Sequence, residues 1–245
     1  MIGGRNGEPM GVDTGAASLA SARAEILQRI RSATGGVSNA EVARAGWTRL
    51  PREYRRAATR GREAVLELLE DRLRDYDANV VRVGRDGVSA IVAKMLSERG
   101  KTRMVVPAGI AKEWLPAGVE FVVDEGLSAV DLDRFDGVMT GSTMAIAQTG
   151  TVILQSVPGQ GRRAVTLIPD YQLCVVREED VVETVPEAMA RLQETAELPT
   201  TFFSGPSATA DIEMTRIKGV HGPRYLDVVL MGCRVLREKL FDKSP

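Results

Sequence analysis

The 245-residue chain contains 44% hydrophobic and 27% charged residues, a globular composition with enough apolar side chains to cover a central sheet. Lysine and arginine number 32 against 33 aspartate and glutamate, which excludes a net positive field that would attract nucleic acid or an anionic membrane. With two cysteines, no CxxC pair and one histidine, we expect no metal or iron–sulfur site built by this chain alone.

Residues 1–18 are rich in glycine and lack the apolar core of a signal peptide, which predicts a disordered N-terminal tail. No later stretch approaches the roughly 18 apolar residues of a membrane-spanning helix. Cys174 and Cys233 lie in apolar runs, which favours buried thiols in a reducing compartment over a disulfide. We therefore expect a cytoplasmic protein without a membrane span.

Apolar residues at helical spacing predict a helix over 19–33 and another over 59–74, whose apolar stripe lies opposite its charges. Between them, residues 39–54 predict a short helix and a proline turn. We expect residues 19–76 to form a helical segment packed on the core, as one folding unit with an α/β domain over 77–245.

A basic cluster runs from Arg49 to Arg62 and alternates with glutamate. Such alternation is typical of a solvated helix face, and the cluster would bind an acidic ligand only if it folded over a pocket. The sequence leaves open whether three of its arginines reach a pocket, namely Arg52, Arg55 and Arg56.

From residue 77 onward, short apolar runs alternate with helical patterns over 86–98 and 186–196, which predicts strands joined by right-handed parallel crossovers. The runs are continuous, as in strands that are buried on both faces. The predicted strands are 79–83, 103–106, 119–123, 137–140, 151–154, 164–168, 173–176 and 227–231. The expected architecture is an α/β fold with a mostly parallel sheet, helices on both faces and an N-terminal helical appendage.

The first of two glycine-rich loops covers Thr140–Thr151. Its glycines permit close backbone approach and its hydroxyl groups add donors, which together favour binding of a carboxylate or phosphate. The candidate ligand-binding residues are Gly141, Ser142, Thr143, Thr149, Gly150 and Thr151. In the alternative interpretation, serine and threonine cap a short helix over Met144–Ala147. The loop matches neither a Walker A sequence nor a dinucleotide fingerprint, and the stretch 159–163 favours a basic hairpin turn over a phosphate site.

The second loop covers Ser204–Pro223. A serine or threonine near its start is expected to cap a helix whose first N–H groups favour an anion. The candidate ligand-binding residues are Gly205, Ser207, Thr209 and Gly222, and the candidate catalytic residues are Asp211, Glu213 and His221. One carboxylate would act as general base or orient the histidine. Alternatively, the carboxylates complement the helix dipole and the histidine is structural or exposed.

The two loops together resemble the lactate utilisation protein C family, whose members carry the LUD domain. The likeness rests on GSTMAIAQTGT at 141–151, SGPSATADIE at 204–213 and GVHGP at 219–223. Residues 50–55, Leu-Pro-Arg-Glu-Tyr-Arg, and 75–76, Asp-Tyr, are similar to the family's N-terminal pattern. The likeness spans most of the chain, and the combination of the two long motifs is specific.

The resemblance implies a fold similar to the sugar-phosphate isomerase and CoA-transferase superfamily (NagB/RpiA/CoA transferase-like), with ligands at strand ends. It also implies an accessory or substrate-binding subunit of an L-lactate utilisation system, working with iron–sulfur subunits in the oxidation of L-lactate to pyruvate. Iron–sulfur clusters are then expected only in the partner subunits, with no cofactor in this chain. The expected ligand is a small carboxylate or another anion, and a homo-oligomer is compatible with the sequence.

Two further hypotheses stay open. The chain would be a free-standing enzyme of the isomerase, CoA-transferase or formyltetrahydrofolate cyclo-ligase type, with Asp211 or Glu213 as nucleophile or base and His221 as acid. Alternatively, it would be a non-catalytic assembly module whose loops pack against another subunit. The resemblance indicates a pathway more firmly than a reaction, so whether the chain is itself an enzyme is left undecided.

Overall fold

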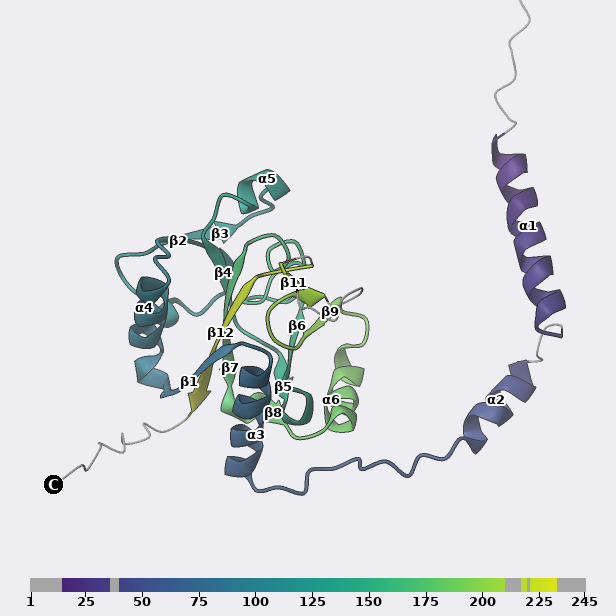
Figure 1. The fold of residues 1–245 in the computed structure, drawn as a ribbon, viewed down its shortest axis with the longest axis horizontal. Helices are drawn as coiled ribbons and strands as arrows, with labels where there is room; N and C mark the ends of the chain where they lie inside the picture. The colour runs from purple at the N-terminus through teal and green to yellow at the C-terminus, as the bar shows by residue number, and fades with distance from the viewer. Residues whose placement is uncertain (1–14, 36–39, 210–216, 220, 233–245) are drawn as a thin grey trace, which may run out of the picture. The chain divides into compact units, whose positions relative to one another are not determined.

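The computed structural model describes residues 15–35, 40–209, 217–219 and 221–232 (Figure 1). The chain divides into two compact units, Met1–Tyr54 and Arg55–Pro245, and each is described by itself. Most of the predicted N-terminal tail lies outside the described residues.

The first unit contains two helices, α1 (Gly15–Ala33) and α2 (Ala40–Arg49). The helix predicted over 19–33 is confirmed, and it begins at Gly15. The basic cluster does not form a helix face, because residues 50–61 connect α2 to the second unit's first helix as loop and turn. Arg52 stacks on Trp47, with 4.8 Å between the guanidinium carbon and the ring centroid.

Six parallel strands form the main sheet of the second unit, as the sequence predicts, in the order β1-β12-β7-β4-β2-β3. Their bounds are β1 (Asn79–Gly84), β12 (Tyr225–Gly232), β7 (Tyr171–Arg177), β4 (Gly137–Thr140), β2 (Arg103–Pro107) and β3 (Glu120–Asp124). All residues of β4, and all but one of β7 and of β12, are buried. Burial on both faces explains why these strands have continuous apolar sequences.

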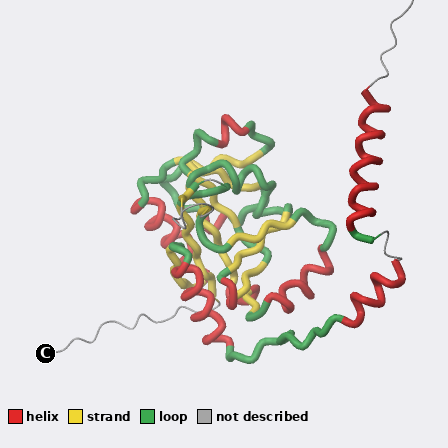
Figure 2. The backbone as a smooth tube through the Cα atoms, turned by 45° about the vertical axis from the view of Figure 1, so that its right-hand side comes forward, coloured by secondary structure: helices red, strands yellow, loops and turns green. Residues whose placement is uncertain are grey.

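Helices cover both faces of this sheet, which confirms the predicted layers (Figures 1 and 2). The predicted stripe of α3 (Arg62–Asp75) is buried against one face through Val65, Leu66, Leu69 and Leu73. On the opposite face, α4 (Val88–Glu98) buries four residues in a separate cluster. The remaining helices are α5 (Ala129–Leu132) and α6 (Val185–Leu192).

A second sheet, which the sequence does not predict, has the order β8-β5-β6-β9. Its strands are β5 (Met144–Ile146), β6 (Thr151–Gln155), β8 (Val181–Val182) and β9 (Thr200–Phe203). The strand predicted over 151–154 therefore belongs here, where β6 runs antiparallel to β5 and β9. Because β5 is extended, the alternative of a helix over Met144–Ala147 is wrong.

Two further local predictions are wrong. Residues 164–168 form successive turns, with hydrogen bonds such as Val165 N–H to Arg162 O at 3.1 Å, and no strand. Residues Ala208–Thr209 form β10, which pairs antiparallel with β11 (Ile217–Lys218), so Ser207 does not cap a helix. A helix capped by Thr209 would lie outside the described residues.

Glu183, which follows strand β8 of the second sheet, binds residues 55–60 at the start of the second unit. Its fully buried carboxylate accepts the N–H groups of Thr59 at 2.6 Å and Arg60 at 3.0 Å, and it pairs with Arg55 at 2.7 Å. These contacts, led by the backbone hydrogen bond from Arg60, hold the pKa of Glu183 below its usual range. Arg55 is therefore engaged in a structural ion pair.

Within the described ranges, no helix has the length and apolar character required to cross a membrane. The same residues contain no group of three or more histidine, cysteine, aspartate or glutamate side chains arranged to hold a metal ion.

The thiol of Cys174 is predicted to be unreactive in the folded protein. Cys174 is fully buried in β7, and burial raises the pKa of its thiol to about 12, so almost no thiolate forms at neutral pH. In a Cys233→Ser variant, which leaves one cysteine, we expect a thiol reagent to label the native protein only at the rate of unfolding. Stoichiometric labelling in denaturant is the control, and rapid labelling of the native protein would contradict the assignment.

Candidate functional site

Because the six main strands are parallel, the loops that follow strands lie at one edge of the sheet, the carboxyl edge, and the loops that precede strands lie at the other, the amino edge. Residues 141–143 follow the carboxyl end of β4, whereas residues 221–223 immediately precede the amino end of β12. The first loop therefore begins at the carboxyl edge and the second loop ends at the amino edge, and each edge has its own cavity.

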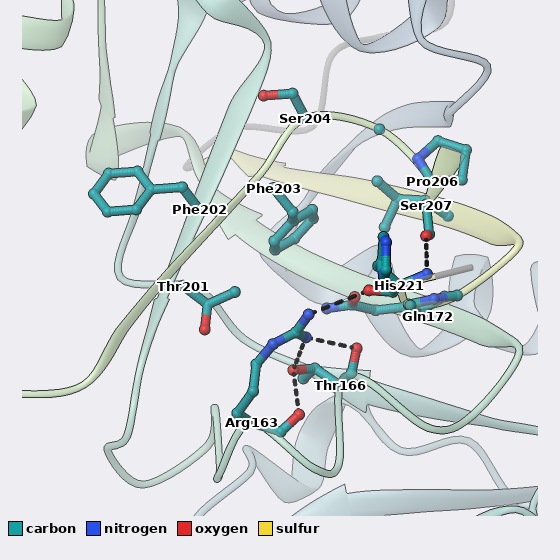
Figure 3. A pocket seen from close by; sticks show the side chains of 14 residues that line it. Arg163, Thr166, Gln172, Thr201, Phe202, Phe203, Ser204, Pro206, Ser207 and His221 are labelled. Carbon is teal, nitrogen blue, oxygen red and sulfur yellow. Dashed lines mark hydrogen bonds between the residues drawn. The ribbon is translucent and has the colours of Figure 1, made fainter. Parts of the chain in front are cut away.

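The amino-edge cavity has a volume of about 240 Å³ and lies where the second loop meets the starts of β7 and β12 (Figure 3). Its polar lining combines one guanidinium, one imidazole and several hydroxyl and amide groups. The lining residues are Arg163, Thr166, Gln172, Thr201, Phe202, Phe203, Ser204, Gly205, Pro206, Ser207, His221, Gly222, Pro223 and Leu226.

Arg163 is held in this cavity by three hydrogen bonds. Its Nη1 donates to Thr166 O at 3.1 Å and to Thr166 Oγ1 at 3.2 Å, and its Nη2 donates to His221 O at 3.4 Å. Figure 3 shows the guanidinium between these two residues. The acceptors are all neutral, so the positive charge of Arg163 has no carboxylate partner among the described residues.

Ser207 ties the two ends of the second loop together. Its Oγ accepts the His221 N–H at 2.9 Å, and its own N–H donates to Pro223 O at 2.8 Å. These bonds fix the backbone of His221, whose side chain is exposed and lines the cavity. Gly205, Ser207, Gly222 and His221 thus all line this cavity.

The end of the first loop reaches the same edge. Thr149 Oγ1 lies 2.7 Å from Thr151 Oγ1, which lies 2.8 Å from Ser204 Oγ. Gly150, between the two threonines, packs against Arg72 of α3, where an added Cβ would lie 2.8 Å from Arg72 Cβ. These three residues support the wall of the amino-edge cavity without lining it.

The beginning of the first loop lies elsewhere. Gly141, Ser142 and Thr143 line a second cavity of about 380 Å³ at the carboxyl edge, whose lining includes no residue of the second loop. The Ser142 hydroxyl donates to Val175 O at 3.2 Å and the Thr143 hydroxyl donates to Gln160 Oε1 at 2.9 Å. The expectation that both loops form one pocket is therefore wrong: Gly141, Ser142 and Thr143 line a different cavity. Among the described residues, Thr151, at the end of the first loop, contacts the second loop through Ser204.

The remaining predicted residues have no described side chain. Asp211 and Glu213 lie outside the described residues, and Thr209 is placed only by the backbone pairing of β10. They stay predictions.

The sequence did not predict Arg163 as a site residue, because the stretch 159–163 was interpreted as a turn. Residues 158–160 form a turn, and Gly159 and Gly161 have φ angles of 81° and 78°, but this turn is not the predicted hairpin, because residues 164–168 form no strand. The turn brings Arg163 to the cavity. Two adjacent arginines after a glycine turn were the available signal. The structure separates them, since Arg162 pairs with Asp124 at 2.8 Å.

A cavity that combines a histidine with a guanidinium whose partners among the described residues are neutral oxygens can bind a small carboxylate and exchange a proton with it. Arginine recognises carboxylates through parallel N–H donors, and histidine is the side chain whose ordinary pKa lies closest to neutrality.

Comparisons with known proteins agree on one family. The model of the LUD domain matches residues 16–231. The chain is 42% identical over 218 residues to lactate utilization protein C of Deinococcus radiodurans, covering 88% of this chain and 98% of that protein. It is 27% identical to lactate utilization protein C of Macrococcus caseolyticus, covering 66% and 75%. A crystal structure of a DUF162 family protein from Deinococcus radiodurans superposes with a TM-score of 0.63 and 38% identity, covering 71% of this chain and all of that chain.

Gly205 is predicted to be required for the shape of the amino-edge cavity. Its φ is 79°, and an added Cβ would lie 2.4 Å from Tyr76 Cβ. We expect Gly205→Ala to lower the free energy of unfolding by roughly 2 to 4 kcal/mol, measured by urea denaturation. As control, Gly61→Ala adds a Cβ that contacts nothing within 4 Å, at a helix N-cap with φ of −64°. A change of less than about 1 kcal/mol is expected there, and equal effects of the two variants would contradict the prediction.

Proposed function

We propose that this chain, which belongs to the LUD domain family, acts in lactate utilisation by holding L-lactate in the amino-edge cavity while iron–sulfur partner proteins accept its electrons. Support for the pathway comes from the relatives named lactate utilization protein C, one of which is 42% identical over 88% of this chain. The observation that carries the proposed role is that Arg163 and His221 line one small cavity.

Each polar group of lactate has a counterpart in this cavity. The guanidinium of Arg163, whose described partners are neutral oxygens, would pair with the carboxylate. The imidazole of His221 would accept the proton of the 2-hydroxyl group. The hydroxyl groups of Ser204 and Thr201 and the amide of Gln172 line the same space and supply further hydrogen bonds.

The reaction balances only with an electron acceptor. Oxidation of L-lactate to pyruvate breaks the O–H and C2–H bonds and releases two electrons and two protons. His221 would take the hydroxyl proton, and the proton from C2 would pass to a base or to water at the partner proteins. The proposal assigns the electrons to iron–sulfur clusters held by partner proteins. In this scheme the chain binds and orients the substrate, and the partner proteins supply the redox groups.

The test separates binding from proton transfer. We expect Arg163→Gln to weaken L-lactate binding by roughly 10- to 100-fold, since a hydrogen bond to a charged group is lost. We expect His221→Asn to bind L-lactate nearly as well while kcat falls by about 100-fold or more. Binding is measured by calorimetry, and turnover by lactate-dependent dye reduction with iron–sulfur proteins purified from lactate-grown cells.

Arg134→Gln is the matched control, because Arg134 is exposed, pairs only with Asp131 among the described residues and lies outside the cavity. It should leave both binding and turnover unchanged. The proposal is wrong if the wild-type chain does not bind L-lactate and dye reduction is the same when the chain is withheld.

A further inference from the structure

The carboxyl-edge cavity is a second hollow, open to solvent, that the proposed lactate site does not use. It has a volume of about 380 Å³ and shares no lining residue with the amino-edge cavity. Its walls come from the segments that follow β2, β4, β6 and β7.

The position of this cavity in the sheet favours ligand binding. β2 and β4 are neighbours, but the next main-sheet strand after β2 is the edge strand β3, whereas the next one after β4 is the interior strand β7, which the chain reaches through β5 and β6 of the second sheet. Adjacent strands whose connections diverge leave a crevice at their carboxyl ends, which is where open parallel sheets bind ligands. Residues 109–111 and 141–143 line the cavity at this point.

The walls of the cavity are fixed by close backbone contacts. Gly109 and Gly159 both have positive φ, and an added Cβ on Gly109 would lie 2.6 Å from Pro158 Cβ. Gly141 lies against Trp114, since an added Cβ would be 3.6 Å from Trp114 Cζ3. Trp114 is 6% exposed and thus presents one part of its ring to the cavity while the rest is buried.

Arg177, at the end of β7, supplies the positive charge of the cavity. Its described ion pair is with Glu179, at 3.8 Å between two side chains that are 50% and 63% exposed. Such an exposed pair contributes little, so a ligand carboxylate or phosphate competes with it readily. Gln160 adds an amide: its Oε1 accepts the Gln155 N–H and the Thr143 hydroxyl, which leaves Nε2 as its donor.

Asp180 provides a carboxyl group whose pKa is raised. Among the described residues, none donates a hydrogen bond to its side chain. Burial raises its pKa above the usual range, and Glu179 adds to this effect, while Arg177, Arg191 and Arg62 oppose it. A carboxyl group with a raised pKa is protonated at higher pH than usual and then donates a hydrogen bond to an oxygen of a ligand.

We propose that the carboxyl-edge cavity binds a small anion, a carboxylate or a phosphate, which pairs with Arg177, receives a hydrogen bond from Asp180 and rests against Trp114. This site is separate from the amino-edge cavity and does not depend on the lactate proposal. The two ligand types share the same oxyanion chemistry, and the experiment distinguishes them.

Trp114 makes the test direct, because the chain has two tryptophans. In a Trp47→Phe background, Trp114 is the single tryptophan and its fluorescence reports on the cavity. We titrate this protein with inorganic phosphate, pyruvate and L-lactate in separate experiments. A saturable change with at least one probe is expected, and the probe that binds most tightly identifies the type of anion.

Three variants assign the signal to this site. Arg177→Gln should weaken binding by about 10-fold or more, because the ion pair is lost. Arg163→Gln, at the other cavity, and Arg134→Gln, on the surface, should leave it unchanged.

Binding by the Trp47→Phe protein should strengthen as pH falls through the raised pKa of Asp180. Asp180→Asn, which keeps a donor but does not titrate, should abolish that dependence.

The proposal fails if no probe gives a saturable change in Trp114 fluorescence. It also fails if Arg163→Gln abolishes the change while Arg177→Gln leaves it intact, which would place the anion in the amino-edge cavity. Because Arg177 is exposed, its replacement is expected to leave the urea midpoint unchanged, and this measurement accompanies each titration.

Discussion

The common direction of the six main strands is the constraint on which the functional surface depends. In a parallel sheet, the loops that follow strands lie at one edge and the loops that precede strands lie at the other. Residues 141–143 follow β4 and residues 221–223 precede β12, so their strands place them at opposite edges. Two motifs that specify one family thus contribute to two cavities.

The β5–β6 hairpin is the element that joins the two edges. It begins beside Thr143 at the carboxyl edge and turns at Gly150, which packs on α3 near the start of the main sheet. From there Thr151 contacts Ser204, the residue that opens the second loop. The hairpin spans residues 144–155 and separates the two ends of the first loop. Residues 141–143 therefore line the carboxyl-edge cavity, whereas residues 149–151 support the wall of the amino-edge cavity.

Much of this fold is predictable because it depends on local patterns. The hydrophobic stripe of α3 and the apolar runs of the parallel strands follow directly from which residues of each element are buried, so they can be read from the sequence of that element alone. The second sheet is different, because strands as short as β8, with two residues, exist only through pairing with distant segments. The same limit applies to the sites: His221 and Ser207 are close in sequence and were predicted together. Arg163 and Asp180 reach their cavities only through tertiary packing.

The two cavities share no lining residue, yet their construction is linked. A hollow of about 520 Å³ between them is lined by Arg163 and Thr166 of one cavity and by Gln155 and Gln160 of the other. The two glutamines are 4% and 8% exposed, and the Gln155 N–H donates to Gln160 Oε1 at 2.8 Å. Buried amides must be satisfied, so this pair holds the end of β6 against the turn that precedes Arg163. The position of Arg163 at the amino edge and the shape of the carboxyl-edge cavity therefore rest on the same buried hydrogen bonds.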